Sequence, residues 1–201
     1  PRRPKTRQAS TPTSATPRSP CYRANLSSRL DHDYMTDDQR FAARRPDVLV
    51  YATSDLDEEV TLAGPLEASL WVSVTGTDAD FVVKLIDVYP QDHADPEPNP
   101  SGVKMGGYQA LVRGEVMRGK FRASFEKPEP FTPGEPTLVR FSIPDTSHTF
   151  RAGHRIMIQI QSSWFPLVDR NPQIFTDIYR ATQADFHAAT HRVYRTKDKP
   201  S

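Results

Sequence analysis

The distribution of proline constrains the fold of this chain more than any other feature. The 201 residues include 19 prolines, which break long helices, and no segment carries a 3.6-residue apolar repeat over three turns. Several short segments instead alternate apolar and polar residues, as residues 155–161 do with Ile156, Ile158 and Ile160. Strands are predicted at residues 47–53, 67–74, 81–90, 108–119, 137–143, 155–161 and 187–196.

Turns rich in proline and glycine separate these segments, which is typical of an all-β sandwich. We therefore predict one all-β domain, a jelly-roll β-sandwich. Residues 81–90 are apolar on both faces, so they are expected to form a central strand that is covered on both sides until Pro90. Residues 31–46 form a polar lead-in that predicts one helical turn before Pro46.

The N-terminal segment differs in composition from the rest of the chain. Of residues 1–20, twelve are Pro, Ser or Thr, and such a segment buries too little surface to offset its ordering entropy. Residues 1–30 hold seven basic and no acidic side chains, which leaves 19 basic and 25 acidic residues in 31–201, a formal net charge of −6. We predict a disordered basic arm over residues 1–30, and no nucleic-acid partner, because an acidic body repels phosphates.

Cysteine content and hydropathy limit the cross-links, membrane segments and compartments that the sequence allows. Cys21 is the only cysteine, so the chain has no intrachain disulfide and no cysteine metal cluster. It lacks an apolar run long enough for a membrane span and lacks the apolar core of a signal peptide. We expect no membrane partner and, by default, a cytoplasmic protein, with the periplasm or secretion open for an intact enzyme.

The side chains that could suggest catalysis lack the surroundings that catalysis needs. Ser162 and Ser163 follow an alternating strand without the G-x-S-x-G turn and helix of a hydrolase elbow, so we interpret them as serines at a strand end. His154 follows a glycine and suits a turn. His187 and His191 are four residues apart but lie in a segment that reads as a strand. We expect no catalytic residue, metal ion or cofactor in this chain.

Two further groups of residues leave alternatives open. Asp92, Asp95 and Glu97 share a loop with His93 and could suggest calcium binding, although the prolines of this loop favour a rigid solvated turn.

Four aromatic residues could form a ligand-stacking surface, as in lectin domains, although aromatic residues in strands usually belong to the core. They are Trp71, Tyr89, Trp164 and Phe165. Trp164 and Phe165, at a strand end, are our candidates for a substrate-pocket or domain-interface contact.

Four consecutive blocks of sequence resemble a known family. They are RRPDVLVYAT (44–53), EVTLAGPLEASLWVSVTGTDADFVVKLIDVYP (59–90), GGYQALVRGEVMRG (106–119) and FTPGEPTLVRFSIPDTSHTFRAGHRIMIQIQSSWFPLVDRNP (131–172). Over residues 33–197 the chain resembles the C-terminal domain of the family of serine hydrolases that includes X-Pro dipeptidyl-peptidases, cocaine esterases and α-amino acid ester hydrolases. The resemblance implies a galactose-binding-domain-like jelly roll.

The resemblance also implies the function. In this family the catalytic Ser, Asp and His belong to a preceding α/β-hydrolase domain, and none of them maps onto this chain. The chain is therefore expected to be a non-catalytic domain that supports the catalytic domain, helps to wall its substrate pocket and contributes to assembly, including a homo-oligomer in the intact enzyme. The alternative is a free-standing carbohydrate-binding jelly roll.

Residues 1–20 differ from the linker that the resemblance predicts, which has the form Y-V-S-D-P followed by P-V-P-Y. Codons for Thr13–Pro17 can spell Y-V-S-D-P in another reading frame. We therefore hypothesise that the arm is an out-of-frame remnant of the linker, which the upstream nucleotide sequence would decide.

Overall fold

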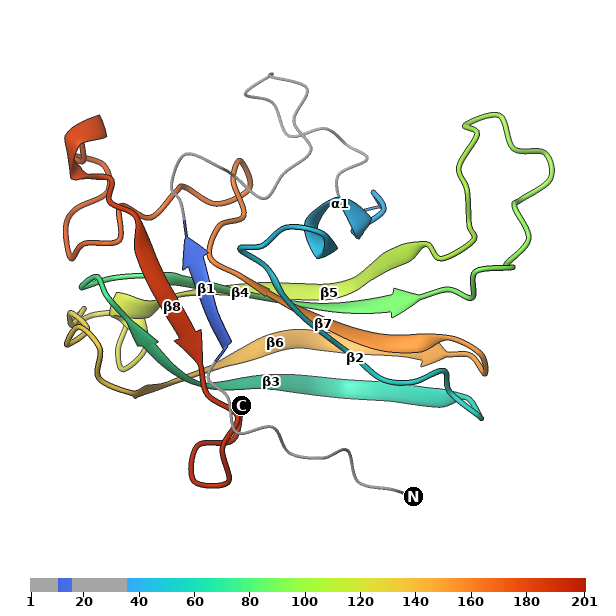
Figure 1. Ribbon diagram of the computed structural model, residues 1–201, viewed down its shortest axis with the longest axis horizontal. Helices are drawn as coiled ribbons and strands as arrows, with labels where there is room; N and C mark the ends of the chain where they lie inside the picture. Colours follow the sequence, from blue (N-terminus) through green and yellow to red (C-terminus); the bar gives the residue numbers. More distant parts are fainter. Residues whose placement is uncertain (1–10, 16–35) are drawn as a thin grey trace.

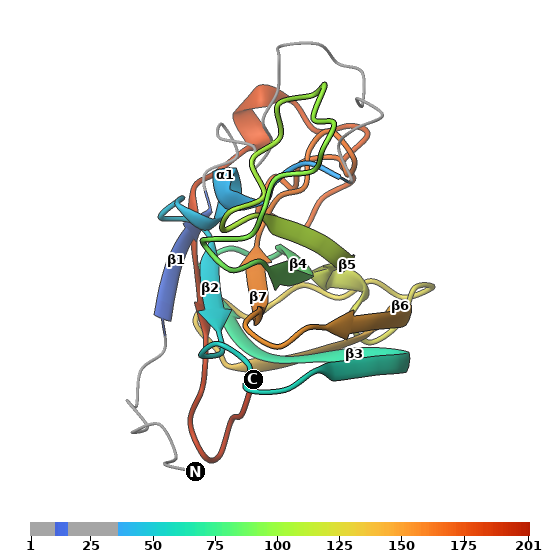
Figure 2. The same cartoon turned by 90° about the vertical axis from the view of Figure 1, so that its right-hand side faces the viewer.

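The chain folds into two antiparallel β-sheets packed face to face (Figures 1 and 2). The computed structural model describes residues 11–15 and 36–201. The first sheet has the order β1-β8-β3-β6, and its strands are β1 (Thr11–Ala15), β8 (Ala189–Val193), β3 (Val60–Val74) and β6 (Thr137–Phe150). The second sheet has the order β2-β7-β4-β5, and its strands are β2 (Leu49–Ala52), β7 (Arg155–Gln161), β4 (Asp80–Val88) and β5 (Gln109–Arg118). The predicted β-sandwich is confirmed.

The main core lies between the two sheets. The inward side chains of β3 alternate with outward polar ones, so Leu70 and Val72 face Phe81 and Val83 of β4. Fifteen buried residues form this cluster, which is the burial that the two-residue alternation predicts for a sheet with one covered face.

Strand β4 is the central strand that its sequence predicts, because all nine of its residues are buried. Its outer side chains are covered by segments outside the sheets. Helix α1 (Arg40–Ala43) and the long connection between β7 and β8 both lie over this outer face of the second sheet (Figures 1 and 2). Short 3-10 turns at Gly119–Phe121 (η2) and Gln183–Asp185 (η3) complete the described elements. No helix in the described parts of the chain has the length and hydropathy needed to cross a membrane.

Strands β3 and β6 extend beyond their predicted ranges and pair with each other as two long antiparallel strands (Figure 1). Gly64, with φ of 122°, marks a bulge in β3 where the register shifts before Leu66. Pro144 lies in β6, which is an edge strand, where the missing N–H of a proline is tolerated. The glycine and the proline resemble turn signals in the sequence, so the extensions were not predicted.

Within the predicted arm, Thr11–Ala15 form strand β1 and pair with β8. The physical reason is that β8 offers a free backbone edge, and pairing with it needs no apolar side chains. The rest of the predicted arm, residues 1–10 and 16–30, lies outside the described residues.

Candidate docking site

The β7–β8 connection, residues 162–188, is anchored to the second sheet by a buried ion pair. Arg118 at the end of β5 donates two hydrogen bonds to Asp80 of β4, each 3.0 Å long. Asn171 of the connection donates to the same carboxylate at 2.8 Å, and Arg118 also donates to the carbonyl of Asp169. Burial raises the pKa of the Asp80 carboxyl, and the Arg118 guanidinium opposes this rise. Asp80 therefore needs both partners, and these partners fix the connection in place.

A second anchor holds the connection to the first sheet. Gln173 has a φ of 70°, and its carbonyl accepts a hydrogen bond from the backbone N–H of Thr77. A Cβ on Gly76 would lie 2.1 Å from this carbonyl oxygen, so only glycine allows the close approach. The Gln173 amide oxygen lies 2.7 Å from Nε2 of His191 in β8. Burial lowers the pKa of His191 to about 4, so this ring is neutral near pH 7.

The anchored connection presents aromatic side chains to solvent. Lys120 donates to the carbonyl of Thr176 at 2.8 Å, and on either side of this contact lie Phe175, 43% exposed, and Tyr179, 86% exposed. Phe125, 77% exposed, stacks on Phe121 across the neighbouring loop. We call Phe121, Phe125, Phe175 and Tyr179 the aromatic surface.

A hollow of about 460 Å³ opens within this surface, lined among others by Arg118, Lys120, Phe121, Pro128, Phe175 and Tyr179. Exposed aromatic side chains around a hollow are typical of a surface that another protein covers.

The two candidates of the sequence analysis occupy different environments within the connection. Trp164 is only 4% exposed and packs on Val82 of β4, with Nζ of the buried Lys84 5.0 Å from its ring. A Cβ on Gly114 would lie 2.8 Å from the Trp164 ring, so the glycine makes room for it. Phe165 is half-buried, and Arg170 lies over its ring at 5.7 Å. Of the two side chains, only Phe165 has a substantial accessible part.

The structure brings His154 together with residues that the sequence analysis left apart. Its Nδ1 lies 2.8 Å from one oxygen of the buried Asp87 in β4, and Nε2 of His148 in β6 lies 3.0 Å from the other oxygen. The Tyr89 and His93 rings pack nearby, and a hollow of about 420 Å³ adjoins the group. The shared carboxylate links the two sheets, so the structure gives the group an architectural role.

The other polar candidates are scattered. Among the described residues no hydrogen bond joins the hydroxyl of Ser162 or Ser163 to a histidine, and Ser162 is buried. His187 is exposed before β8 whereas His191 is buried within it, so the two rings do not share a helical face. In the loop that suggested calcium, Asp95 binds Lys104 and the N–H of Met105. No three His, Cys, Asp or Glu residues in the described parts are placed to hold a metal ion.

The aromatic residues that suggested a stacking surface do not gather in one place. Trp71 lies on the outer side of the first sheet, since its neighbours Leu70 and Val72 face the core. Trp164 covers the outer side of the second sheet. The two tryptophans therefore lie on opposite sides of the sandwich. The signal that sequence reasoning missed was the pair Phe175 and Tyr179, two aromatic residues in a polar connection.

The fold and this site define a β-sandwich domain with an anchored, aromatic surface loop. A family model described as the X-Pro dipeptidyl-peptidase C-terminal non-catalytic domain matches residues 5–201. The chain belongs to this family, as the sequence motifs indicated. The match also includes residues of the arm that the sequence analysis placed outside the family resemblance.

Solved structures and a curated relative support the assignment. An aminopeptidase from a marine sediment Thaumarchaeota archaeon superposes with a TM-score of 0.86 at 40% identity, over 98% of this chain and 33% of that chain. An α-amino acid ester hydrolase has a TM-score of 0.82 at 39% identity, over 94% of this chain and 31% of that one. Cocaine esterase from Rhodococcus sp. is 35% identical over 82% of this chain. The chain spans 26% of that esterase, so it corresponds to a minor part of these enzymes.

Proposed function

We propose that this domain acts as the non-catalytic partner of an α/β-hydrolase catalytic domain, which it supports and whose substrate pocket it helps to shape. The observation that carries the proposal is that a chain matched to a non-catalytic domain over almost its whole length spans only 26–33% of its enzyme relatives. The remaining part of such an enzyme would cover a surface with exposed aromatic side chains.

The aromatic surface is the proposed contact. Phe175 and Tyr179 would bury large apolar areas against the catalytic domain, as interface aromatics do. The Asp80–Arg118–Asn171 anchor holds their backbone before contact, which lowers the ordering cost of association. Phe165 is the proposed pocket-facing residue. The buried Trp164, which packs on Val82 of β4, would hold the neighbouring Phe165 in position.

Co-expression with the α/β-hydrolase part of an α-amino acid ester hydrolase relative tests the proposal. We expect the two fragments to co-purify and to hydrolyse phenylglycine methyl ester, which neither the isolated chain nor a no-protein blank should do. The double variant Phe175→Ser/Tyr179→Ser should weaken co-purification at least tenfold, because two interface aromatics are lost.

The matched control is Glu67→Ser, an exposed position on the outer side of the first sheet. It should co-purify like the wild type. Equal retention of the double variant and the control would exclude the aromatic surface as the contact, and turnover by the isolated chain would contradict a non-catalytic role.

A further inference from the structure

A cavity of about 570 Å³ lies between the two sheets, away from the aromatic surface. Its volume falls in the range of small-molecule sites in proteins. Aliphatic side chains from both sheets form the walls, among them Leu62, Leu66 and Ile143 from the first sheet and Val83, Leu85 and Ile158 from the second. An apolar hollow of this size is favourable to fill, because its walls lack packing partners.

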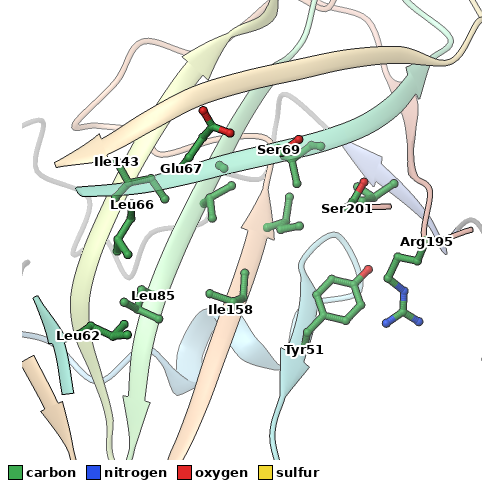
Figure 3. A pocket seen from close by; sticks show the side chains of 15 residues that line it. Tyr51, Leu62, Leu66, Glu67, Ser69, Leu85, Ile143, Ile158, Arg195 and Ser201 are labelled. Carbon is green, nitrogen blue, oxygen red and sulfur yellow. The ribbon is translucent and has the colours of Figure 1, made fainter. Parts of the chain in front are cut away.

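The polar groups of the cavity lie together at one end. Figure 3 shows Tyr51, Arg195 and Ser201 on one side and Leu62, Leu66 and Leu85 on the other. The guanidinium carbon of Arg195 lies 4.5 Å from the centre of the Tyr51 ring. The Ser201 hydroxyl accepts a hydrogen bond from the backbone N–H of Trp71. The cavity is therefore amphipathic along its length.

The Tyr51 hydroxyl is the second observation that points to a ligand. Its oxygen is buried and has no hydrogen-bond partner among the described residues. A buried hydroxyl without a partner is unfavourable, and an acceptor placed beside it would satisfy it.

Arg195 brings a positive side chain to this end of the cavity. Arg195 is exposed, and its guanidinium, which lies over the Tyr51 ring, carries five N–H donors that a bound group could accept from. Glu67, which also borders the cavity, turns its carboxylate away from it (Figure 3) and pairs with Arg140 at 3.2 Å on the outer side of the first sheet. An acceptor that carries negative charge matches this arrangement better than a neutral one.

We propose that this cavity binds a medium-chain alkyl carboxylate. The alkyl chain would occupy the aliphatic end, and the carboxylate would accept hydrogen bonds from the Tyr51 hydroxyl and the Arg195 guanidinium. The inference stands independently of the proposed docking on a catalytic domain, because it uses the space between the sheets and its polar end.

Calorimetric titration of the whole chain with octanoate and decanoate below their micelle concentrations, and with decanol below its solubility limit, tests the proposal. Decanoate should bind about fifteenfold more tightly than octanoate, because each buried methylene contributes about fourfold. Decanoate should also bind more tightly than decanol. No measurable binding, or binding that does not depend on chain length, would overturn the proposal.

Three variants assign the binding to this cavity. Ile158→Trp fills the space from a half-buried position of β7 and should abolish binding of decanoate and decanol. If Ile158→Trp does not melt cooperatively, Leu62→Trp fills the cavity from the facing sheet. Arg195→Gln should weaken decanoate about tenfold and leave decanol unchanged.

The matched control for Arg195→Gln is Arg140→Gln, an exposed arginine on the outer side of the first sheet. It should bind decanoate like the wild type. If both arginine variants lose the same affinity, or if a folded, cavity-filled variant still binds, the ligand lies elsewhere and the proposal is wrong.

Discussion

At the scale of single residues, His191 shows how burial fixes a protonation state. The ring lies in the core beside Phe81, and its Nε2 is satisfied by Gln173 of the β7–β8 connection. Burial disfavours the charged imidazolium and lowers the pKa to about 4, from an ordinary value of 6.5. The histidine that suggested a metal ligand in the sequence is thus a neutral structural residue.

The lowered pKa predicts an acid-sensitive fold. Because the pKa is lower in the folded chain, the unfolded chain takes up a proton first as the pH falls. The free energy of unfolding that neutral His191 contributes is therefore fully present above pH 6.5. It falls by about 3 kcal/mol as the pH drops from 6.5 to 4. In urea titrations, His191→Gln should lose less free energy of unfolding than the wild type between pH 7.5 and 4.5.

His187→Gln is the control, since this exposed histidine precedes the same strand. Its pH profile should follow that of the wild type. Parallel profiles for His191→Gln and the wild type would mean that His191 does not titrate differently in the two states.

At the scale of elements, the sequence predicted the strands that a pattern of apolar and polar residues marks. It missed the strand extension that depends on pairing with another strand. The pattern of Ile156, Ile158 and Ile160 marked β7 correctly, and the two apolar faces of 81–90 marked a buried strand. The extension of β3 past Gly64 was missed because it depends on pairing with β6.

The candidate site was less predictable than the strands. The sequence pointed to the strand end at Trp164 and Phe165, but the burial of Trp164 depends on the space that Gly114 leaves on a neighbouring strand. Likewise, the exposure of Phe175 and Tyr179 depends on anchors that lie far away in the sequence. Local patterns do not contain such long-range contacts.

The anchor of the β7–β8 connection predicts a strong coupling between Asp80 and Arg118. Arg118→Met leaves a buried carboxylate without its cation and should cost about 3–5 kcal/mol in the free energy of unfolding. Adding Asp80→Asn should recover part of this loss, because the uncompensated charge is removed. Hydrogen exchange at residues 171–178 should rise in Arg118→Met.

The control for this cycle is Arg113→Met, an exposed arginine on the same strand, which donates to the carbonyl of Asp145. It should leave stability nearly unchanged. Additive losses for Asp80→Asn and Arg118→Met would show that the pair does not act as a unit.

A second element-scale prediction concerns the carboxylate that links β4 to β6. Asp87→Asn replaces one accepting oxygen with an N–H donor, so the histidine that faces the amide nitrogen must change tautomer and accept, or lose its contact. We expect a loss of about 1–3 kcal/mol in thermal or urea unfolding near pH 7. Asp145→Asn, an exposed change on β6, should have no such effect, and equal stabilities of the two variants would contradict the linking role.

At the scale of the whole molecule, the sandwich has two unlike outer faces. The outer face of the first sheet carries polar pairs such as Glu67 with Arg140. The outer face of the second sheet is covered by α1 and the β7–β8 connection (Figure 2), and the connection exposes Phe175 and Tyr179 to solvent. This asymmetry is what a domain that packs on a larger enzyme through one side would have.

The aromatic surface predicts that the isolated chain associates with itself, since an uncovered apolar patch finds other partners. Light scattering should show an average mass above that of the 22.7 kDa monomer as the concentration rises. Phe175→Ser/Tyr179→Ser should shift this rise to at least tenfold higher concentration, whereas Glu67→Ser should not. A wild-type chain that stays monomeric at millimolar concentration would show that this surface is too weakly apolar to drive docking, and the proposed contact would then have to lie on another face.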